Sequence, residues 1–173
     1  GYTYAQIQTN GILQKQAYNG SIKIKDPNIN FISNLEVDFN ENTPTFNAVG
    51  DLTNANLNAL QFSNNQIQLT GLLDVNFTGS NIDNFIGSAK FYNGKLKSTT
   101  NTINFDSVSL KSTITKGNKQ IILSSDDIQA SIAGKFNIDQ LPNSVQYFLQ
   151  GYFPNYIKNL KEAPVNQQFS FQV

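Results

Sequence analysis

The sequence contains no cysteine, no histidine, no methionine and no tryptophan. The missing cysteine excludes a disulfide framework and thiolate metal sites, and it leaves the redox compartment open. The missing histidine removes the commonest general base and the commonest metal ligand. The chain also lacks a phosphate-binding glycine motif and a nucleophile elbow. We therefore expect no enzymatic activity, no catalytic residues, no metal and no cofactor.

Arginine is absent as well, and the lysines balance the acidic residues, so the net charge is zero. Such a chain offers no basic stripe and no guanidinium fork for phosphate, which argues against nucleic acid as a ligand. No apolar run approaches the roughly 20 residues of a membrane-spanning helix, and no charged-then-apolar leader opens the chain. The lack of methionine, even at position 1, predicts an excised or processed fragment.

Carboxylate-only chemistry is the catalytic option that this composition leaves. Asp126 and Asp127 are adjacent, and could belong to a glycosidase pair or a calcium site. Neighbouring residues of a strand point to opposite faces, so these two side chains would converge only in a turn or a bulge. We interpret the pair as the solvated end of a hairpin.

Apolar and polar residues alternate with a period of two along most of the chain, for example over 35–39, 66–70, 73–78 and 102–111. Such alternation is typical of half-buried antiparallel strands. Pairs of Asn and Gly, which tolerate the positive φ of tight hairpins, predict turns at 10–11, 19–20, 93–94 and 117–118. The predicted fold class is mainly β.

One segment near the C-terminus follows a helical pattern instead. Pro142 suits the first helical position, Gly151 suits the C-terminal cap, and apolar residues between them recur at helical spacing. We predict a short amphipathic helix from Pro142 to Gln150. Its apolar face would pack on the end of a sheet or lie at a lipid surface, although its polar face has no lysine. A single turn is predicted over 81–85.

Four pentapeptides share an amide, a small residue, a polar residue and an aliphatic residue in that order, and they begin at Tyr18, Thr53, Tyr92 and Ile128. This regular spacing favours stacked β units. We divide the chain into repeating antiparallel β units over 1–138, an amphipathic helix with a Tyr/Phe-rich flank over 139–160, and a terminal strand or tail over 161–173.

The alternation leaves two arrangements open. In the first, two sheets close their apolar faces on each other as a β-sandwich, and the protein would be a structural or adhesive module of a surface protein. In the second, one long sheet curls into a trough whose apolar wall holds acyl chains and would expose more apolar surface than soluble monomers normally do.

Several motifs occur in a distinctive order between residues 10 and 160: Phe-x-Gly at 77–79, Asn-Ile-Asp-Asn-Phe at 81–85, Asn-Gly-Lys-Leu at 93–96, Phe-Asp-Ser at 105–107, and Gly-x-Phe at 134–136 before the Leu-Pro helix. In pattern and order this region resembles the TamB-like branch of the AsmA-like proteins, in the form found in Bacteroidetes-type bacteria. The resemblance rests on these motifs and not on a catalytic signature.

The resemblance implies a long periplasmic protein, anchored in the inner membrane and reaching the outer membrane of a Gram-negative envelope. Such proteins form a repeating β-groove, a taco-shaped curled sheet with an apolar interior, and are thought to carry phospholipids between the two membranes. Some also assist outer-membrane protein assembly with a barrel partner of the TamA/BamA type. This sequence has neither the anchor nor a recognisable terminal domain, so it resembles an internal slice with flanking repeats.

The lipid-groove candidates are the inward positions of the alternation, for each of which plain core packing is the alternative. They are Leu35, Val37, Phe39, Ile67, Leu69, Leu73, Val75, Phe77, Ile103, Phe105, Val108, Leu110, Ile121, Leu123, Phe136 and Ile138. A register shift of one residue would move them to the opposite face. The expected partners are phospholipid or another acyl-chain lipid. A slice with two unpaired sheet edges also predicts end-to-end or edge-to-edge association.

Overall fold

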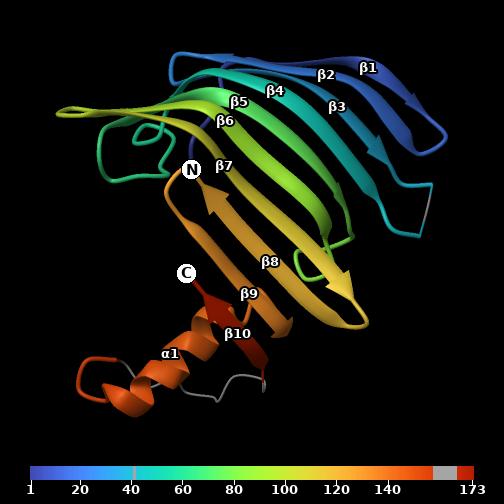
Figure 1. Cartoon of the computed structure of the whole chain (residues 1–173). Coiled ribbons are helices and arrows are strands. Elements are labelled where there is room, and N and C mark those ends of the chain that lie inside the picture. The colour runs from blue at the N-terminus through green and yellow to red at the C-terminus, as the bar shows by residue number, and fades with distance from the viewer. Residues whose placement is uncertain (41, 158–166) are drawn as a thin grey trace.

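The computed structural model describes residues 1–40, 42–157 and 167–173. These residues form ten strands in one sheet, in which each strand pairs antiparallel with the next along the chain (Figure 1). The strands are β1 (Ile7–Gln14), β2 (Ala17–Asp26), β3 (Ile29–Asp38), β4 (Thr45–Asn56), β5 (Ile67–Thr78), β6 (Ile86–Ser98), β7 (Thr102–Thr115), β8 (Asn118–Ser125), β9 (Gln129–Lys135) and β10 (Gln168–Gln172). One helix, α1 (Leu141–Tyr152), separates β9 from β10 in this part of the chain.

The sheet curls but does not close on itself (Figure 1). Within the described residues β1 and β10 end the order of strands, and no second sheet covers either face. The predicted mainly β fold, a curled antiparallel sheet with one short helix near the C-terminus, is therefore confirmed. The alternative of a closed β-sandwich is wrong.

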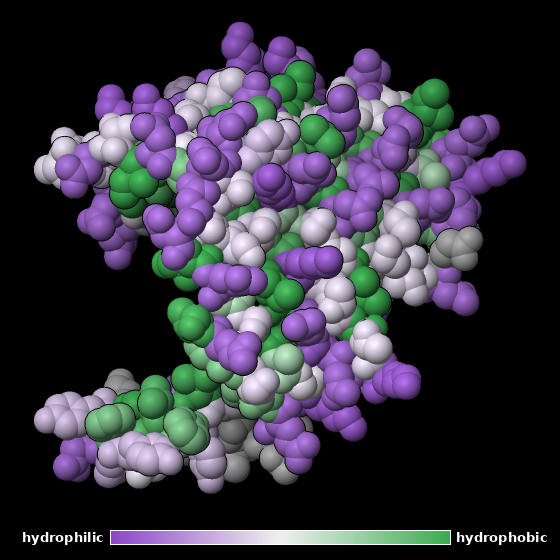
Figure 2. All heavy atoms as spheres, in the orientation of Figure 1, coloured by the Kyte–Doolittle hydropathy of each residue, from purple (hydrophilic) through white to green (hydrophobic). Residues whose placement is uncertain are grey.

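Cross-strand partners define the two faces of the sheet, because residues directly opposite each other share a face. The register traces one such row across seven strands: Leu35, Ala48, Val75, Ala89, Leu110, Leu123 and Ala130. We call the face that carries this row the inner face, since it lines the hollow of the curl, and the opposite one the outer face. Figure 2 shows the hollow as an open notch between the upper strands and helix α1.

Bulges interrupt the period of two near one margin of the sheet. The register shifts between Leu52 and Ala55 of β4, and again where Asn93 and Gly94 of β6 lie opposite Gly71. In these stretches an extra residue bends the strand and returns the following residues to the inner face. The predicted turn at Asn93-Gly94 is therefore wrong, because it is a bulge inside β6, with Asn93 at a positive φ of 51°.

The real hairpin turns partly match the predicted ones. Gly117 forms a two-residue turn with Lys116 between β7 and β8, at φ 79° and 50°, one residue before the predicted pair at 117–118, because Asn118 already pairs in β8. The equivalent turn between β1 and β2 is Lys15-Gln16, at φ 48° and 62°, which no Asn-Gly signal marks. Both have the mirror-image geometry that suits the twist of hairpins. The predicted turns at 10–11 and 19–20 are wrong, because Gly11 and Gly20 face each other within β1 and β2.

Glycines of the inner face make room for aromatic rings from neighbouring strands. A Cβ at Gly50 would lie 2.7 Å from the Phe31 ring, and one at Gly71 would lie 2.6 Å from the Phe91 ring. Each ring thus occupies the space that a side chain on the next strand would fill. Glycine in a strand interior commonly marks such close approach and permits sharp curvature.

Helix α1 is longer than the predicted segment from Pro142 to Gln150. It starts at Leu141, keeps Pro142 in its first turn, and continues through Gly151, so the predicted cap at Gly151 is wrong. None of its residues is buried, and Figure 2 shows apolar side chains gathered over it at the lower left. The expected packing of its apolar face against the sheet is not seen among the described residues, where Phe148 is 62% exposed.

Candidate functional site

The lipid-groove candidates within strands all lie on the inner face. The register places Leu35, Val37, Ile67, Leu69, Leu73, Val75, Phe77, Ile103, Phe105, Val108, Leu110, Ile121 and Leu123 on connected cross-strand rows. Phe39 and Phe136 follow strand ends and contact inner-face rings, Phe46 and Phe169. Ile138 lies past β9, where its backbone N–H is hydrogen-bonded to Asp83.

The inner face is apolar without being buried. Apart from Phe136, the candidates keep part of their surface exposed, and Ile103 is 58% exposed. The buried hydrophobic residues in the described part of the chain are Ala55, Leu60 and Phe136. A closed domain of this length would bury many more, because it normally removes about two thirds of its unfolded surface from water.

The total surface shows how open the molecule is. A compact monomer of 19.2 kDa exposes about 8,400 Å². This chain exposes 12149 Å², roughly 45% more than that expectation. Soluble monomers rarely expose contiguous apolar patches larger than a few hundred Å². An uncovered inner face of this extent is therefore a candidate binding surface.

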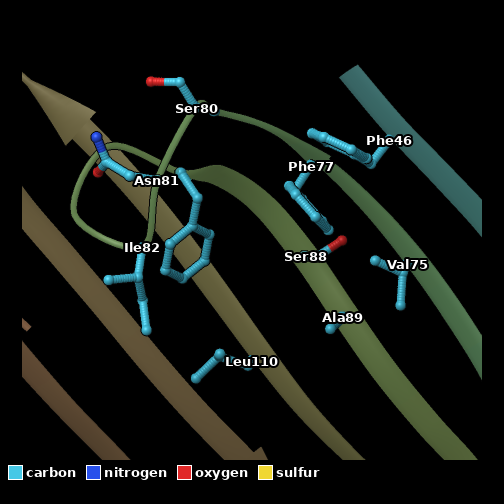
Figure 3. A pocket seen from close by; sticks show the side chains of 11 residues that line it. Phe46, Val75, Phe77, Ser80, Asn81, Ile82, Ser88, Ala89 and Leu110 are labelled. Atoms are coloured by element: carbon cyan, nitrogen blue, oxygen red, sulfur yellow. The ribbon is translucent and has the colours of Figure 1, made fainter. Parts of the chain in front are cut away.

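A pocket of about 380 Å³ opens on the inner face, beneath the loop of residues 79–85 that joins β5 to β6 (Figure 3). The sheet contributes Phe46, Val75, Phe77, Ala89 and Leu110 to its wall, and the loop contributes Ile82 and Phe85. The rings of Phe46 and Phe77 stack at a centroid distance of 4.8 Å. The volume and the apolar wall are typical of sites for small molecules or parts of larger ligands.

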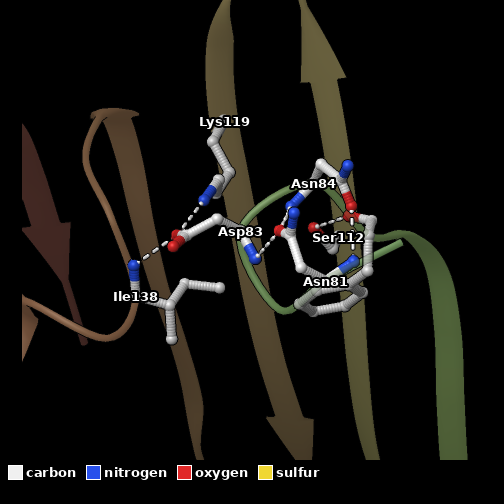
Figure 4. A network of polar contacts seen from close by, with 7 residues as sticks. Asn81, Asp83, Asn84, Ser112, Lys119 and Ile138 are labelled. Carbon is white, nitrogen blue, oxygen red and sulfur yellow. Dashed lines mark hydrogen bonds and ion pairs between the residues drawn. The ribbon is translucent and has the colours of Figure 1, made fainter. Parts of the chain in front are cut away.

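The loop over this pocket is held by its own amides. Asn84 Oδ1 accepts hydrogen bonds from the N–H groups of Ser80 and Asn81, each at 2.9 Å, and Asn81 Oδ1 accepts the N–H of Asp83 at 2.8 Å (Figure 4). Ser112, which is fully buried on β7, donates its hydroxyl to the Phe85 carbonyl at 2.9 Å. These bonds fix the loop as a wall of the pocket, and the turn predicted over 81–85 is confirmed.

An ion pair connects the same loop to strand β8 of the sheet. Lys119 Nζ of β8 lies 2.9 Å from Asp83 Oδ1 and 5.1 Å from the centre of the Phe136 ring. The Ile138 N–H donates to the same carboxylate at 2.6 Å. Partial burial by itself raises the pKa of Asp83, but the Lys119 ammonium and the Ile138 N–H together outweigh burial and lower it.

A second satisfied carboxylate lies at the opposite margin of the inner face. Asp26, at the end of β2, accepts hydrogen bonds from the Tyr2 hydroxyl and from the N–H groups of Ala5 and Asn28, the latter two at 2.8 Å. The Tyr2 hydrogen bond is the main cause that lowers the pKa of Asp26, and the same bond raises the pKa of Tyr2. The inner face thus carries charge only at strand ends within the described residues, and each charge has a partner.

Asp126, in the turn between β8 and β9, binds the backbone of β7. Its carboxylate accepts the backbone N–H of Asp106 at 2.6 Å and that of Ser107 at 3.0 Å. Two consecutive N–H groups that point to one acceptor indicate a local break in the pleat of β7. No group of three or more possible metal ligands occurs in the described residues.

Sequence reasoning missed a large part of the inner face, mostly its aromatic residues. The missed positions include Tyr18, Phe31, Phe46, Phe91, Leu96, Ile132, Phe169 and Phe171. Glycine or alanine takes the neighbouring inward positions on several of these strands, for example Gly87 and Ala89 beside Phe91. A search for alternating large apolar residues does not detect these positions. An aromatic residue two positions from a glycine is a sequence signal that could have found them.

Comparison with known proteins adds no relative. No family model, curated protein or solved structure matches this chain. In the described part of the chain, no helix has the length and apolarity to cross a membrane.

Proposed function

We propose that the inner face is a groove that binds the acyl chains of phospholipids and lets them pass along the sheet. The observation that carries this proposal is an apolar face that runs across the strands and stays uncovered in the described residues, with a pocket of about 380 Å³ in its middle. Water against this face is unfavourable, and each methylene that replaces it contributes about 0.8 kcal/mol.

The lining of the groove supports conduction more than storage. Its middle rows consist mostly of aliphatic, aromatic and glycine residues, such as Leu73, Gly71 and Phe91. The serines among them, Ser33 and Ser112, are buried and donate their hydroxyls to backbone carbonyls. A chain that moves along such a wall exchanges one apolar contact for a similar one, so no deep specific site holds it. The charged side chains of the inner face, Asp26 and Lys119, lie at strand ends on its two opposite margins, which leaves the middle of the groove to acyl chains.

We further propose that the chain is a segment of a TamB-like protein of the Gram-negative periplasm. Sequence resemblance supports this part of the proposal, and the curled open sheet agrees with the β-groove that the family implies. Anchoring in the inner membrane, aid to outer-membrane protein assembly and a barrel partner of the TamA/BamA type belong to the same proposal. The alternative of an adhesive module required a closed core, which the described residues do not form.

The experiment that tests lipid binding is gentle native mass spectrometry with lipid extraction, on protein expressed in bacteria. Val75→Asp puts a charge into the pocket wall, and Gln68→Asp puts the same charge on the exposed outer face of the same strand. Ala89→Trp fills the pocket without adding charge. We expect phospholipid to co-purify with the parent chain and with Gln68→Asp, and to be reduced in the other two variants.

Circular dichroism keeps the result interpretable, because the comparison uses only variants with the spectrum of the parent chain. Lipid lost from both Val75→Asp and Ala89→Trp supports the groove. Absence of lipid from the parent chain, or equal lipid in all four proteins, would refute it.

A further inference from the structure

The first strand leaves one end of the sheet as an open edge. β1 pairs with β2 alone, and all eight of its residues are exposed. The segment before it turns back onto β2, where the Ala5 N–H donates to Asp26 and the Gln6 carbonyl accepts the Lys25 N–H. Within the described residues, nothing pairs with the outer side of β1.

The hairpin determines which backbone groups of β1 are free. In a two-residue hairpin, the residues that flank the turn, Gln14 and Ala17, form a hydrogen-bonded pair, and such pairs recur at every second residue. The Gln6 carbonyl, bonded to the Lys25 N–H at 3.0 Å, fits this alternation. The even-numbered residues therefore bond to β2. The odd-numbered residues direct their N–H and C=O groups to the open edge: Ile7, Thr9, Gly11 and Leu13.

We infer that this edge pairs with β1 of a second copy of the chain, antiparallel and about a two-fold axis at Asn10. In this register Ile7 lies opposite Leu13 of the second copy, Thr9 lies opposite Gly11, and Asn10 lies opposite itself. Every free N–H and C=O group of the odd-numbered residues then finds a partner. The contact uses the same residues on both copies, as two-fold dimers do.

The composition of β1 favours a copy of itself as the occupant. Natural edge strands avoid pairing by means of charged residues, proline or bulges. The sequence IQTNGILQ has no charge and no proline, and its pairing with β2 is regular, so two copies meet without repulsion. Ile7 and Leu13, 53% and 76% exposed, would cover each other on the inner face. Antiparallel pairing also continues the alternation of the whole sheet.

The dimer would join two grooves into one. A two-fold axis perpendicular to the sheet leaves the inner faces of both copies on the same side. The inner-face rows that end at Ile7 and Leu13 would therefore run on into the second copy. This inference concerns the chain of residues 1–173, in which β1 is an edge strand, and it does not depend on lipid binding. In a longer TamB-like protein, a strand of a preceding repeat would take the same edge in place of the second copy.

The size of the contact determines the kind of experiment. A strand of eight residues is about 27 Å long, and a single strand pair is narrow compared with standard protein interfaces. Main-chain hydrogen bonds supply most of the affinity in such strand addition. Association will thus be weak and dependent on concentration, and a covalent trap is the sharpest probe of it.

The chain has no cysteine, so a single introduced cysteine is the only thiol that can form a disulfide between two copies. Asn10 would face Asn10 of the second copy at a non-hydrogen-bonded position, where Cα atoms lie about 4.5 Å apart, within the span of a disulfide. Two copies of Ile12 would lie four residues out of register, about 14 Å apart along the strand. We expect mild oxidation to give a disulfide-linked dimer of Asn10→Cys and little of Ile12→Cys.

A variant that blocks strand pairing distinguishes a disulfide formed in the paired dimer from one formed by random collision. Thr9→Pro removes a free edge donor, and proline is tolerated in an edge strand where the N–H faces solvent. In the Asn10→Cys background we expect Thr9→Pro to abolish the cross-linked dimer while the circular dichroism spectrum is retained. Equal cross-linking of Asn10→Cys and Ile12→Cys would overturn the inference, as would a dimer that Thr9→Pro does not reduce.

Discussion

The ring of Phe105 lies over Gly94, close enough that a Cβ on this glycine would come within 2.0 Å of ring atoms. The two residues are cross-strand partners on β6 and β7, next to the bulge at Asn93. The ring also approaches Phe91, with centroids 6.0 Å apart. On the inner face, the rings of Phe105 and Phe91 therefore occupy the space that side chains at Gly94 and Gly71 would fill.

This contact predicts that Gly94→Ala is destabilising. The added methyl group has no space unless Phe105 moves, and such overpacking costs about 1–3 kcal/mol. Urea denaturation measures the change in the free energy of unfolding. Phe105→Leu in the same chain should restore part of the loss. Gly151→Ala is the control, because nothing lies within 4 Å of that position in helix α1. It should stabilise the helix by roughly 0.5–1 kcal/mol. A Gly94→Ala variant as stable as the parent would contradict the contact.

Lys119→Met should loosen the loop over the pocket. The substitution keeps an unbranched side chain but removes the ammonium group that lies 2.9 Å from Asp83. A hydrogen bond to a charged group contributes about 1.5–3 kcal/mol, and we expect a loss of that order in the free energy of unfolding. Hydrogen exchange should report faster opening of loop 79–85. Lys116→Met, in the exposed turn between β7 and β8, is the matched control and should change neither quantity.

The same ion pair predicts a dependence of stability on pH. The pKa of Asp83 in the folded chain lies below the ordinary value of 3.8. Its contribution to the free energy of unfolding is therefore fully present above the ordinary pKa and is lost as the pH falls through the lower, folded value. Denaturation of the parent chain and of Asp83→Asn from about pH 6 down to about pH 2.5 checks this. The parent chain should be the more stable at the upper end, and the difference should shrink at the lower end. A constant difference would refute the assignment.

Asp126→Ala should damage β7 more than Asp127→Ala damages it. The first change leaves the N–H groups of Asp106 and Ser107 without the carboxylate that binds both. Loss of a partner for such groups costs about 1–3 kcal/mol where water cannot replace it, and less at this exposed turn. We expect a measurable decrease in the urea midpoint for Asp126→Ala alone. Asp126→Asn, which keeps one acceptor oxygen, should lie between the two.

The fold class was predictable because the alternation recurs in several separate strands and is therefore redundant. Residues 73–77 and 35–37 each show one apolar face, and a local error in one strand does not alter the class. Nearly the whole set of lipid-groove candidates lies on one face for the same reason. Periodicity could not distinguish a closed sandwich from an open curled sheet, because both arrangements need strands with one apolar face.

The bulges explain where the sequence was misleading. Ile103 and Phe105 follow one phase of the alternation and Val108 and Leu110 the other, yet all four residues lie on the inner face of the single strand β7. The change of phase marks the break in the pleat of β7 at Asp106 and Ser107, whose N–H groups donate to the Asp126 carboxylate. An Asn-Gly pair indicates positive φ, and a bulge satisfies that preference as well as a turn does, so Asn93-Gly94 could not be assigned from sequence alone.

Each strand of this sheet touches only the strands beside it in the sheet, which are also its neighbours among the strands of the sequence. Among the described elements, strands that are not consecutive make no contact, and a tie such as that of Asp83 with Ile138 comes from a loop. Folding of such a molecule approximates a one-dimensional process, in which a hairpin forms anywhere and strands are added to it in turn. Loss of structure should likewise proceed from the ends inward, strand by strand, without collapse of a common core. The same architecture allows the sheet to lengthen or shorten by whole hairpins while the remaining strands keep their register.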